Sequence, residues 1–273
     1  MAAVKSLLEG LIGAALAAGR EIGRIYRGGF TVRLKQDDSP VTAADHAAER
    51  VILEHLARLA PDIPVVAEER VAAGQIPEIG ERFFLVDPLD GTKEFVSRNG
   101  EFTVNIALVE AGVPTLGVVY APEASWVYAG DTRARVAFRM PFASHDTDLR
   151  RDRVRVPIRV RTPQPSEPLI VVASRSHRDA ATDAYLARLH IARTITVGSS
   201  LKFCLVAAGE ADLYPRATSI SEWDTAAGHA VVVAAGGRVI DARGEPLRYG
   251  KPGFRSGAFV AAGAFEPPPL EPV

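Results

Sequence analysis

Two carboxylates stand three positions apart after an apolar run, in the segment Leu85-Val86-Asp87-Pro88-Leu89-Asp90-Gly91-Thr92. The apolar run at 83–86 is bounded by charged residues, which predicts a buried strand that delivers both aspartates at its end. A hard divalent cation prefers carboxylate oxygens, and magnesium commonly combines one or two of them with substrate phosphate. Gly91 permits a tight backbone path, so the amides that follow it can face an anion. An ordinary turn would use the same residue types, and the segment alone leaves both interpretations open.

Two further acidic elements flank this segment in the sequence. Glu68 and Glu69 directly follow an apolar run at 64–67, and adjacent carboxylates repel each other unless a cation lies beside them. A solvated loop start is the alternative for this pair. Asp224 precedes Thr225-Ala226-Ala227-Gly228-His229 at the predicted N-cap of a helix, where either helix capping or metal ligation suits an aspartate.

Spacing excludes two other uses of paired aspartates. An EF-hand loop requires oxygen ligands at alternate positions, but Pro88 and Leu89 occupy the places between Asp87 and Asp90. Phosphatases of the haloacid dehalogenase type use Asp-x-Asp-Gly-Thr, and the spacing here is one residue longer. Neither aspartate therefore fits the position of a phosphate-accepting nucleophile.

Composition narrows the class of protein. The 273 residues suit one large unit or two modest domains with a shared core, and 47% hydrophobic with 24% charged residues excludes a disordered chain. A net charge of −1 argues against a nucleic-acid-binding surface. The single cysteine, Cys204, lies in an apolar run, which predicts a buried residue without a disulfide partner in a reducing compartment. We expect a cytoplasmic protein, with peripheral association with the inner membrane left open, because no apolar stretch is long enough to span a bilayer.

In the first half, an amphipathic helix is predicted at the N-terminus, since apolar residues recur there at helical spacing and Glu9 interrupts a possible export signal. A second helix should begin after Thr42, the predicted N-cap, with Asp45 at the capping-box position, and end near Pro61. Strands are predicted at 63–67, 83–86, 102–109 and 115–120, the last two as an antiparallel pair.

Residues 131–168 are rich in arginine and proline, and alternating apolar residues at 154–160 predict an edge strand with arginines facing solvent. Beyond them strands are predicted at 169–173, 194–197, 211–214, 238–241 and 258–262, and helices at 179–189, 200–208 and 224–235. This alternation indicates a layered α/β arrangement. We predict an α+β domain at 1–150 that carries most metal ligands, and an α/β domain at 151–273 that carries Asp224 and the residues that select the substrate.

Taken in order, Glu-Glu, Asp-Pro-Leu-Asp-Gly-Thr and Trp-Asp-Thr-Ala-Ala-Gly resemble the inositol monophosphatase superfamily of lithium-sensitive phosphatases, from the first helix to about Gly263. The resemblance implies an α/β fold, the layered αβαβα sandwich of the inositol monophosphatase and fructose bisphosphatase type. Residues 90–95, 98–105, 174–177, 198–204 and 213–216 resemble the 3′(2′),5′-bisphosphate nucleotidases of the CysQ type. Those enzymes remove the 3′-phosphate of adenosine 3′,5′-bisphosphate, a by-product of sulfate activation. Residues 131–168 and the C-terminal tail match no part of that pattern.

The resemblance also implies a cofactor and catalytic roles. Two or three Mg²⁺ ions would be held by Glu68, Asp87, Asp90, Asp224 and the backbone carbonyl of Leu89. The substrate phosphate would lie on the amides of Gly91 and Thr92, and Thr92 linked to Asp45 would orient and deprotonate the attacking water. Glu69 would assist through a water or a third metal. Asp45 thus has two compatible roles, capping box and proton relay, and no covalent phosphoenzyme is expected.

Six further positions resemble substrate contacts: Lys35, Ser174, His177, Ser199, Lys202 and Arg216. Lys202 and Arg216 would supply the cations that a second phosphate requires. His177 suits a surface loop equally well, and an exposed loop lysine is the alternative for Lys35.

The expected function is therefore magnesium-dependent hydrolysis of the 3′-phosphate of adenosine 3′,5′-bisphosphate. The same chemistry on inositol monophosphate, a sugar bisphosphate or the 2′-phosphate of NADP is the nearest alternative. A non-catalytic module that binds magnesium or a nucleotide is the alternative from another class, but it predicts the loss of a ligand or of Thr92, and none is lost. The expected partner is a small phosphorylated molecule rather than a nucleic acid, with the chain as a monomer or a homodimer.

Overall fold

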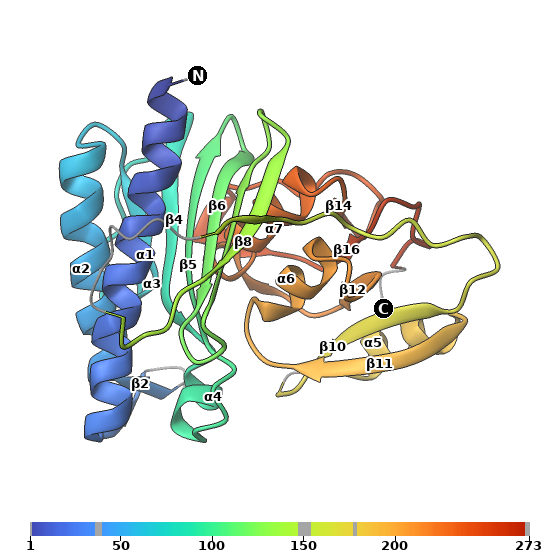
Figure 1. Ribbon diagram of the computed structural model, residues 1–273, viewed down its shortest axis with the longest axis horizontal. Helices are drawn as coiled ribbons and strands as arrows, with labels where there is room; N and C mark the ends of the chain where they lie inside the picture. The colour runs from blue at the N-terminus through green and yellow to red at the C-terminus, as the bar shows by residue number, and fades with distance from the viewer. Residues whose placement is uncertain (1, 36–39, 147–153, 177–178, 271–273) are drawn as a thin grey trace.

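A larger β-sheet lies at the centre of the molecule, with a smaller sheet beside it (Figure 1). The computed structural model describes residues 2–35, 40–146, 154–176 and 179–270. In spatial order the larger sheet contains β3 (Val65–Ala67), β4 (Arg82–Asp90), β5 (Thr103–Glu110), β6 (Val113–Ala121), β7 (Trp126–Asp131), β8 (Val136–Pro141) and β9 (Val156–Pro157). Its neighbouring strands are antiparallel except for β3 and β4, which run parallel.

The smaller sheet contains, in spatial order, β11 (Ile191–Val197), β10 (Leu169–Ser174), β12 (Leu213–Arg216), β16 (Phe259–Ala262) and β14 (Arg238–Asp241). Strand β10 runs parallel to both of its neighbours, whereas β16 runs antiparallel to β12 and β14. Short antiparallel ribbons pair β1 (Val32–Leu34) with β2 (Pro40–Thr42) and β13 (Ile220–Ser221) with β15 (Arg255–Ser256). The strands expected beyond residue 168 are therefore confirmed, with β12 beginning two residues later than predicted.

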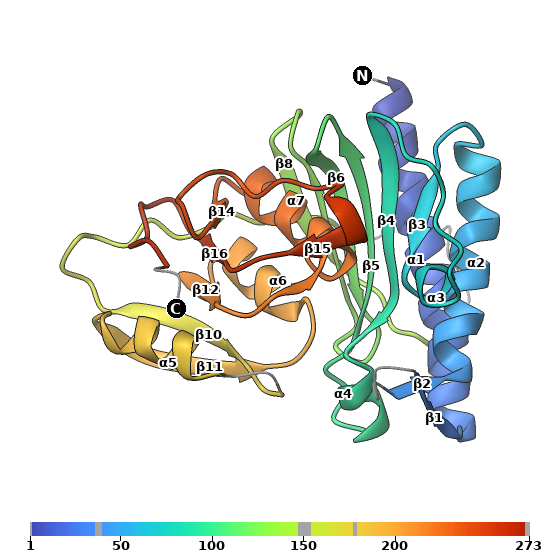
Figure 2. The ribbon, with the colours of Figure 1, turned by 180° about the vertical axis from the view of Figure 1, so that it is seen from behind.

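Helices fill the layers on and between the sheets (Figures 1 and 2). They are α1 (Ala2–Gly28), α2 (Ala43–Leu59), α3 (Glu68–Ala72), α4 (Thr92–Val96), α5 (Ala180–Ala187), α6 (Leu201–Ala207) and α7 (Ala226–Ala234), with 3-10 turns η1 (Glu222–Asp224) and η2 (Pro252–Phe254). Helices α1 and α2 cover one face of the larger sheet, α6 and α7 lie between the sheets, and α5 covers the outer face of the smaller one. The predicted αβαβα sandwich is confirmed. Within the described ranges, no helix combines the length and the apolar character needed to cross a bilayer.

Strand β5 shows why the larger sheet is covered on both faces. Its side chains point alternately to opposite faces, so Val104, Ile106 and Leu108 join the core under α1 and α2. Ala107 and Val109 join the core against α6 and α7. A strand buried on both faces is expected to have a nearly continuous apolar sequence, as β5 does.

Local signals place the start of α2. The Thr42 hydroxyl accepts a hydrogen bond from the Ala44 amide at 3.1 Å, and the Thr42 amide donates to Asp45 Oδ2 at 2.8 Å. The Thr42 hydroxyl thus accepts from a backbone amide in the first turn of α2, and the Asp45 carboxylate accepts from the backbone amide of Thr42. This is the predicted capping box. The amphipathic first helix is also confirmed, and its apolar residues Leu11 and Ile22 are fully buried.

The arginine-rich region differs from the prediction. Strands β7 and β8 form a hairpin that was not expected. Within it, the Arg139 guanidinium carbon lies 4.8 Å from the centre of the Trp126 ring, a cation–π contact between the two strands.

Of the predicted edge strand, Val156–Pro157 forms β9 beside β8, and the Ile158 amide still donates to the Ala137 carbonyl at 3.1 Å. The Val160 amide then donates to the Ala235 carbonyl at the end of α7 at 3.2 Å, so the chain leaves β8 there. Residues 147–153 lie outside the described residues. The division into 1–150 and 151–273 stays a prediction.

Helix α7 approaches the larger sheet very closely. A Cβ atom at Gly117 of β6 would lie 2.3 Å from the Ala227 carbonyl oxygen, and one at Gly130 of β7 would lie 2.8 Å from Val231 Cα. Both distances are shorter than real Cβ contacts, so only glycine permits this packing. This close packing determines where η1, the turn directly before α7, lies against β4 and β5.

We expect Gly117→Ala to lower the free energy of unfolding by about 1–3 kcal/mol, because the added methyl group must displace helix backbone. Urea unfolding of the purified protein measures the change. Gly13→Ala is the matched control, since a Cβ there meets no atom within 4 Å in the middle of α1. That variant should gain about 0.5–1 kcal/mol from helix propensity. Equal stability of Gly117→Ala and the wild type would contradict the packing argument.

Candidate active site

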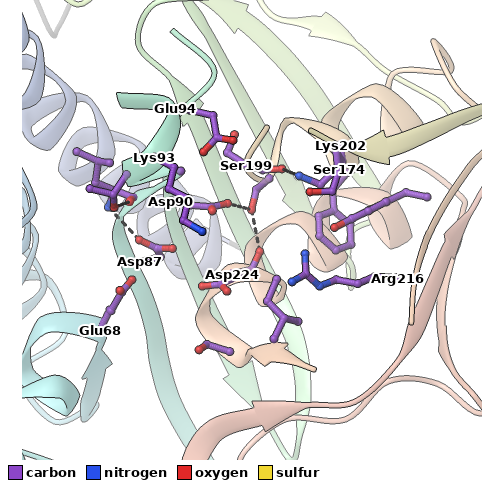
Figure 3. Close-up of a pocket in the computed structure, with 18 of the residues that line it drawn as sticks. Glu68, Asp87, Asp90, Lys93, Glu94, Ser174, Ser199, Lys202, Arg216 and Asp224 are labelled. Atoms are coloured by element: carbon purple, nitrogen blue, oxygen red, sulfur yellow. Dashed lines mark hydrogen bonds between the residues drawn. The ribbon is translucent and has the colours of Figure 1, made fainter. Parts of the chain in front are cut away.

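A cleft of about 320 Å³ opens between the end of β4 and the smaller sheet. Figure 3 shows Glu68 and Asp87 on one side of it, Lys202 and Arg216 on the other, and Asp224 between them. The cleft thus has an acidic side contributed mainly by the first half of the chain and a basic side contributed by the second half. Such a separation of charge suits a ligand that is held through cations at one end and directly by basic groups at the other.

Three carboxylates converge on the acidic side. Glu68, Asp87 and Asp224 each offer an oxygen, and these oxygens lie within 4.8 Å of one another. The parallel register of β3 and β4 brings Glu68 and Asp87 together, because it pairs the residues that directly precede them. Asp224 arrives from η1 at the base of α7. The structure therefore brings together three of the four predicted carboxylate ligands.

Burial makes this group costly without a cation. Burial raises the pKa of Asp87 well above its usual range, and the charges of Glu68 and Asp90 raise it further. Burial likewise raises the pKa of Asp224 and of Glu68. Close carboxylates in a dry site stay ionised only when positive charge neutralises them. An all-oxygen donor set with this charge fits a hard divalent cation such as Mg²⁺.

An irregularity in β4 aims both aspartates into the cleft. In a regular strand, residues three apart point to opposite faces. Here Asp87 pairs with Asn105 and Asp90 with Thr103, so β4 holds one more residue than β5 over this stretch. That is a β-bulge, a feature that re-aims side chains beside active sites. Because of this bulge, two aspartates that are three positions apart can point into the same cleft.

Asp90 lines the cleft but lies outside the three-carboxylate group. Its Oδ2 accepts a hydrogen bond from the Ser200 hydroxyl at 2.8 Å and one from the side-chain nitrogen Nδ2 of Asn105 at 3.3 Å. The Ser200 hydroxyl is also 2.7 Å from the Asp224 carbonyl oxygen, so it bridges the two halves of the site. Sequence reasoning missed Asn105 and Ser200. The available signal for Asn105 was a polar residue in the middle of an otherwise apolar strand.

Lys35 and Glu69 lie next to the three carboxylates. The Lys35 ammonium is 2.6 Å from both Glu68 Oε1 and Glu69 Oε1, and its side chain is 13% exposed, so the alternative of an exposed loop lysine is wrong. Burial alone would lower the pKa of Lys35, but the charges of Glu68 and Glu69 raise it overall. Burial raises the pKa of Glu69 to about 7. The Glu69 amide donates to Glu49 Oε2 at 2.8 Å, which anchors the start of α3.

Thr92 and Asp45 meet as predicted. The Thr92 hydroxyl donates to Asp45 Oδ1 at 3.2 Å, while Asp45 Oδ2 accepts both capping bonds from Thr42 at 2.8 Å. The two carboxylate oxygens therefore divide their tasks, and both proposed roles of Asp45 are geometrically compatible. Burial raises the pKa of Asp45. Gly91, directly before Thr92, adopts φ +90°, a conformation that favours glycine.

One predicted role of Asp224 is wrong. The residue lies in η1, and α7 begins two residues later with Thr225 in the N-cap position, so Asp224 does not cap the helix. Its neighbour Trp223 is 8% exposed and packs in the core between the sheets. Cys204 is fully buried, and burial raises the pKa of its thiol, which confirms the prediction of an inert apolar residue.

Most of the residues predicted to contact substrate line the basic side of the cleft: Ser174, Ser199, Lys202 and Arg216. The Lys202 ammonium donates to the Ser199 carbonyl oxygen at 2.5 Å, and burial lowers the pKa of Lys202 to about 8. Among the described residues, Arg216 Nε is buried without a hydrogen-bond partner. A buried unpaired donor is costly and suits an anionic ligand. His177 lies outside the described residues.

Comparison with known proteins gives a consistent picture. The family model of the inositol monophosphatase family matches residues 3–264. The 3′(2′),5′-bisphosphate nucleotidase CysQ of Salmonella typhimurium is 49% identical over 258 residues, which cover 91% of this chain and 98% of that protein. The protein of the same name from Escherichia coli K12 is 48% identical over 246 residues, 87% of this chain and 94% of the relative.

Solved structures show the same likeness. CysQ from Bacteroides thetaiotaomicron, described as a bacterial member of the inositol monophosphatase family, has a TM-score of 0.78 and 37% identity over 95% of this chain and 97% of its own. Inositol monophosphatase from Anabaena has a TM-score of 0.73 and 28% identity over 96% and 92% of the two chains. The shared fold, the converging carboxylates and the family match lead to one conclusion: the chain belongs to the inositol monophosphatase family.

Proposed function

We propose that the chain is a magnesium-dependent phosphatase that converts adenosine 3′,5′-bisphosphate into AMP and inorganic phosphate. The observation that carries this proposal is the pairing of three converging carboxylates with two cationic side chains, the buried Lys202 and the partly buried Arg216, across one cleft. A substrate with two phosphates satisfies both sides. A substrate with one phosphate leaves the basic side unpaired. The nucleotidase names of the relatives support the same substrate.

Two or three Mg²⁺ ions form part of the proposal. Glu68, Asp87, Asp90, Asp224 and the carbonyl of Leu89 would hold them, and the raised carboxyl pKa values and the oxygen-only donor set support that assignment. Bound there, the ions would supply charge neutralisation and Lewis-acid activation of water and of the leaving oxygen. Lithium sensitivity, a family property, belongs to the same proposal.

The remaining steps are assigned to side chains. The Thr92 hydroxyl, held by Asp45, would orient the attacking water, and Asp45 would accept the proton through it. Its raised pKa makes Asp45 a better proton acceptor than an exposed carboxylate. Glu69 would assist through a second water, and the Gly91 and Thr92 amides would receive the phosphate oxygens.

The second phosphate would bind on the basic side, through Lys202 and Arg216 with Ser174 and Ser199. His177 remains part of the proposed contact set, and Lys35 would screen the acidic side next to the reacting phosphate. With a pKa of about 8, Lys202 is cationic at neutral pH, and a bound phosphate stabilises its charged form. A monomer or a homodimer in the cytoplasm completes the proposal.

Phosphate release from adenosine 3′,5′-bisphosphate, inositol 1-phosphate, fructose 1,6-bisphosphate and NADP, each with and without Mg²⁺, tests the proposal directly. We expect kcat/KM for the adenosine bisphosphate to exceed that for inositol 1-phosphate by about tenfold or more, since a substrate with one phosphate leaves the cations of the basic side unpaired. Fructose 1,6-bisphosphate and NADP carry more than one phosphate and test whether the separation of the phosphates also matters. Asp90→Asn should abolish most of the activity. A preference for inositol 1-phosphate would reject the nucleotide substrate and keep the metal chemistry. No release from any compound would reject the proposal.

Thr92→Val tests the water-orienting role. We expect kcat to fall by about 10² or more with little change in KM, because the side chain keeps its shape but loses the hydroxyl that contacts Asp45. Steady-state kinetics at saturating Mg²⁺ measure both constants. Thr92→Ser keeps the hydroxyl and should recover most of the lost rate. Equal kcat values for Thr92→Val and the wild type would contradict the role.

Metal-free stability tests the carboxylate group. Asp87 and Asp224 have raised pKa values in the folded state, so the folded protein binds more protons than the unfolded chain above about pH 4. Burial lowers the pKa of His229 to about 3, which opposes this trend up to about pH 6.5. From about pH 6.5 to about 8 the free energy of unfolding in EDTA should therefore fall as pH rises. Mg²⁺ should reduce this fall.

Asp224→Asn removes one of the repelling charges. We expect the metal-free variant to gain about 1 kcal/mol or more at pH 8 relative to the wild type, and to lose most of the stabilisation by Mg²⁺. Urea unfolding with EDTA or with Mg²⁺ measures both effects. Asp62→Asn, a change at an exposed carboxylate, serves as the control. A variant less stable than the wild type in EDTA would show that these carboxylates do not repel each other.

A further inference from the structure

One carboxylate of the first half ties together two strand ends of the second half. Glu101, between α4 and β5, forms a bidentate ion pair with Arg175, with Oε2 and Oε1 each 2.7 Å from a guanidinium nitrogen. Glu101 Oε2 also accepts the Gly198 amide at 2.8 Å. Arg175 directly follows β10 and Gly198 directly follows β11, and these strands are parallel neighbours. Both strand ends are therefore anchored on the first half.

Glu94 adds a second anchor at the same place. Its side chain is 4% exposed, and its Oε1 accepts the Ser176 hydroxyl at 2.5 Å. A Cβ atom at Gly198 would lie 2.6 Å from Glu94 Cγ and 3.0 Å from the Glu101 carbonyl oxygen, so the backbone of the second half lies directly against the first. The carboxylate clamp is defined as Glu94, Glu101, Arg175, Ser176 and Gly198.

The clamp is adjacent in sequence to the basic side of the cleft. Ser174 precedes Arg175 and Ser199 follows Gly198, and both serines line the cleft. Ser199 has φ +49°, an uncommon conformation for a residue with a side chain, which must be held by its neighbours. Its carbonyl oxygen accepts the Lys202 ammonium at 2.5 Å. A continuous series of contacts thus runs from Glu101 through Gly198 and Ser199 to the Lys202 ammonium.

The clamp also touches the acidic side. Glu94 belongs to α4, the short helix that begins at Thr92 directly after Gly91. One end of the clamp is therefore fixed to the proposed site of the reacting phosphate, and the other end to the proposed site of the second phosphate. Partly exposed ion pairs contribute little to the free energy of unfolding. Glu101 and Arg175 are partly exposed, at 22% and 45%, so position rather than stability is the main consequence of their contact.

We propose that Glu101, together with Arg175 and Glu94, is a positioning residue that sets the distance between the two phosphate sites and thereby selects substrates that carry two phosphates. This inference rests on the proposed function. A substrate with one phosphate binds only on the acidic side, so its binding does not depend on where the clamp holds the basic side. One that spans the cleft needs both sites at the correct separation, and a small misplacement of a binding group weakens catalysis strongly.

Glu101→Gln and Arg175→Gln, alone and combined, test the proposal. For each protein, kcat/KM is measured for adenosine 3′,5′-bisphosphate and for adenosine 3′-phosphate, which lacks the second phosphate. Calorimetry measures the Kd of AMP, which carries only the 5′-phosphate. We expect the ratio of the two kcat/KM values to fall about tenfold and the Kd of AMP to rise about tenfold in either variant. The double variant should lose clearly less than the sum of the two single losses, because both changes break the Glu101–Arg175 ion pair.

Two controls make the result specific. Glu9→Gln breaks a bidentate ion pair with Arg155 of similar geometry, 2.6 and 2.7 Å, far from the cleft, and should leave the ratio and the Kd of AMP unchanged. Arg175→Lys keeps the charge and should recover part of the ratio. Inhibition by inorganic phosphate reports the acidic side, and its Ki should change by less than about twofold in the clamp variants.

Equal losses for the two substrates, or no loss for either, would overturn the proposal. So would additive effects in the double variant. A wild-type protein that does not prefer the bisphosphate and does not bind AMP would reject the proposed function, and the clamp inference with it. Preference in the wild type with unchanged clamp variants would reject the clamp alone.

Discussion

Repulsion among Glu68, Asp87 and Asp224 is the constraint on which the rest of the structure depends. These groups come from a strand end, a bulged strand and a 3-10 turn, and each is held there by contacts outside the group. The turn itself is anchored by Glu222, a fully buried carboxylate that accepts the Gly250 amide at 2.7 Å and the Lys251 amide at 3.2 Å. The favourable free energy of apolar packing on both faces of the larger sheet offsets the unfavourable repulsion among these carboxylates.

Helix α7 explains how two distant parts of the chain form one site. It lies between the sheets, and glycines in β6 and β7 let it approach the larger sheet at backbone distance. The turn that carries Asp224 therefore reaches β4 without a long loop. On the other side of the cleft, α6 presents Lys202, and β12 of the smaller sheet presents Arg216. The cleft lies between these layers, so the carboxylates at the end of the larger sheet face the cations of α6 and β12.

Much of this arrangement could be predicted from sequence because the signals were local. The capping box at Thr42 and the strand before Asp87 depend on residues that are neighbours in the chain. Asn105, Ser200 and Glu101 could not be assigned roles, since their partners are distant in sequence. Composition obscured the β7–β8 hairpin, where Arg139 gains a cation–π contact with Trp126 that no local pattern reveals. The expected cap at Asp224 failed because η1 precedes the helix there.

The two oxygens of Asp45 join architecture to chemistry within a single side chain. Oδ2 closes the first turn of α2, and Oδ1 receives the hydroxyl of Thr92. An amide at this position would keep one acceptor and exchange the other for a donor, so it could serve one task only by giving up the other. Under the proposed function, selection for a more stable helix start and selection for faster turnover act on the same atom pair. Neither property can drift independently of the other.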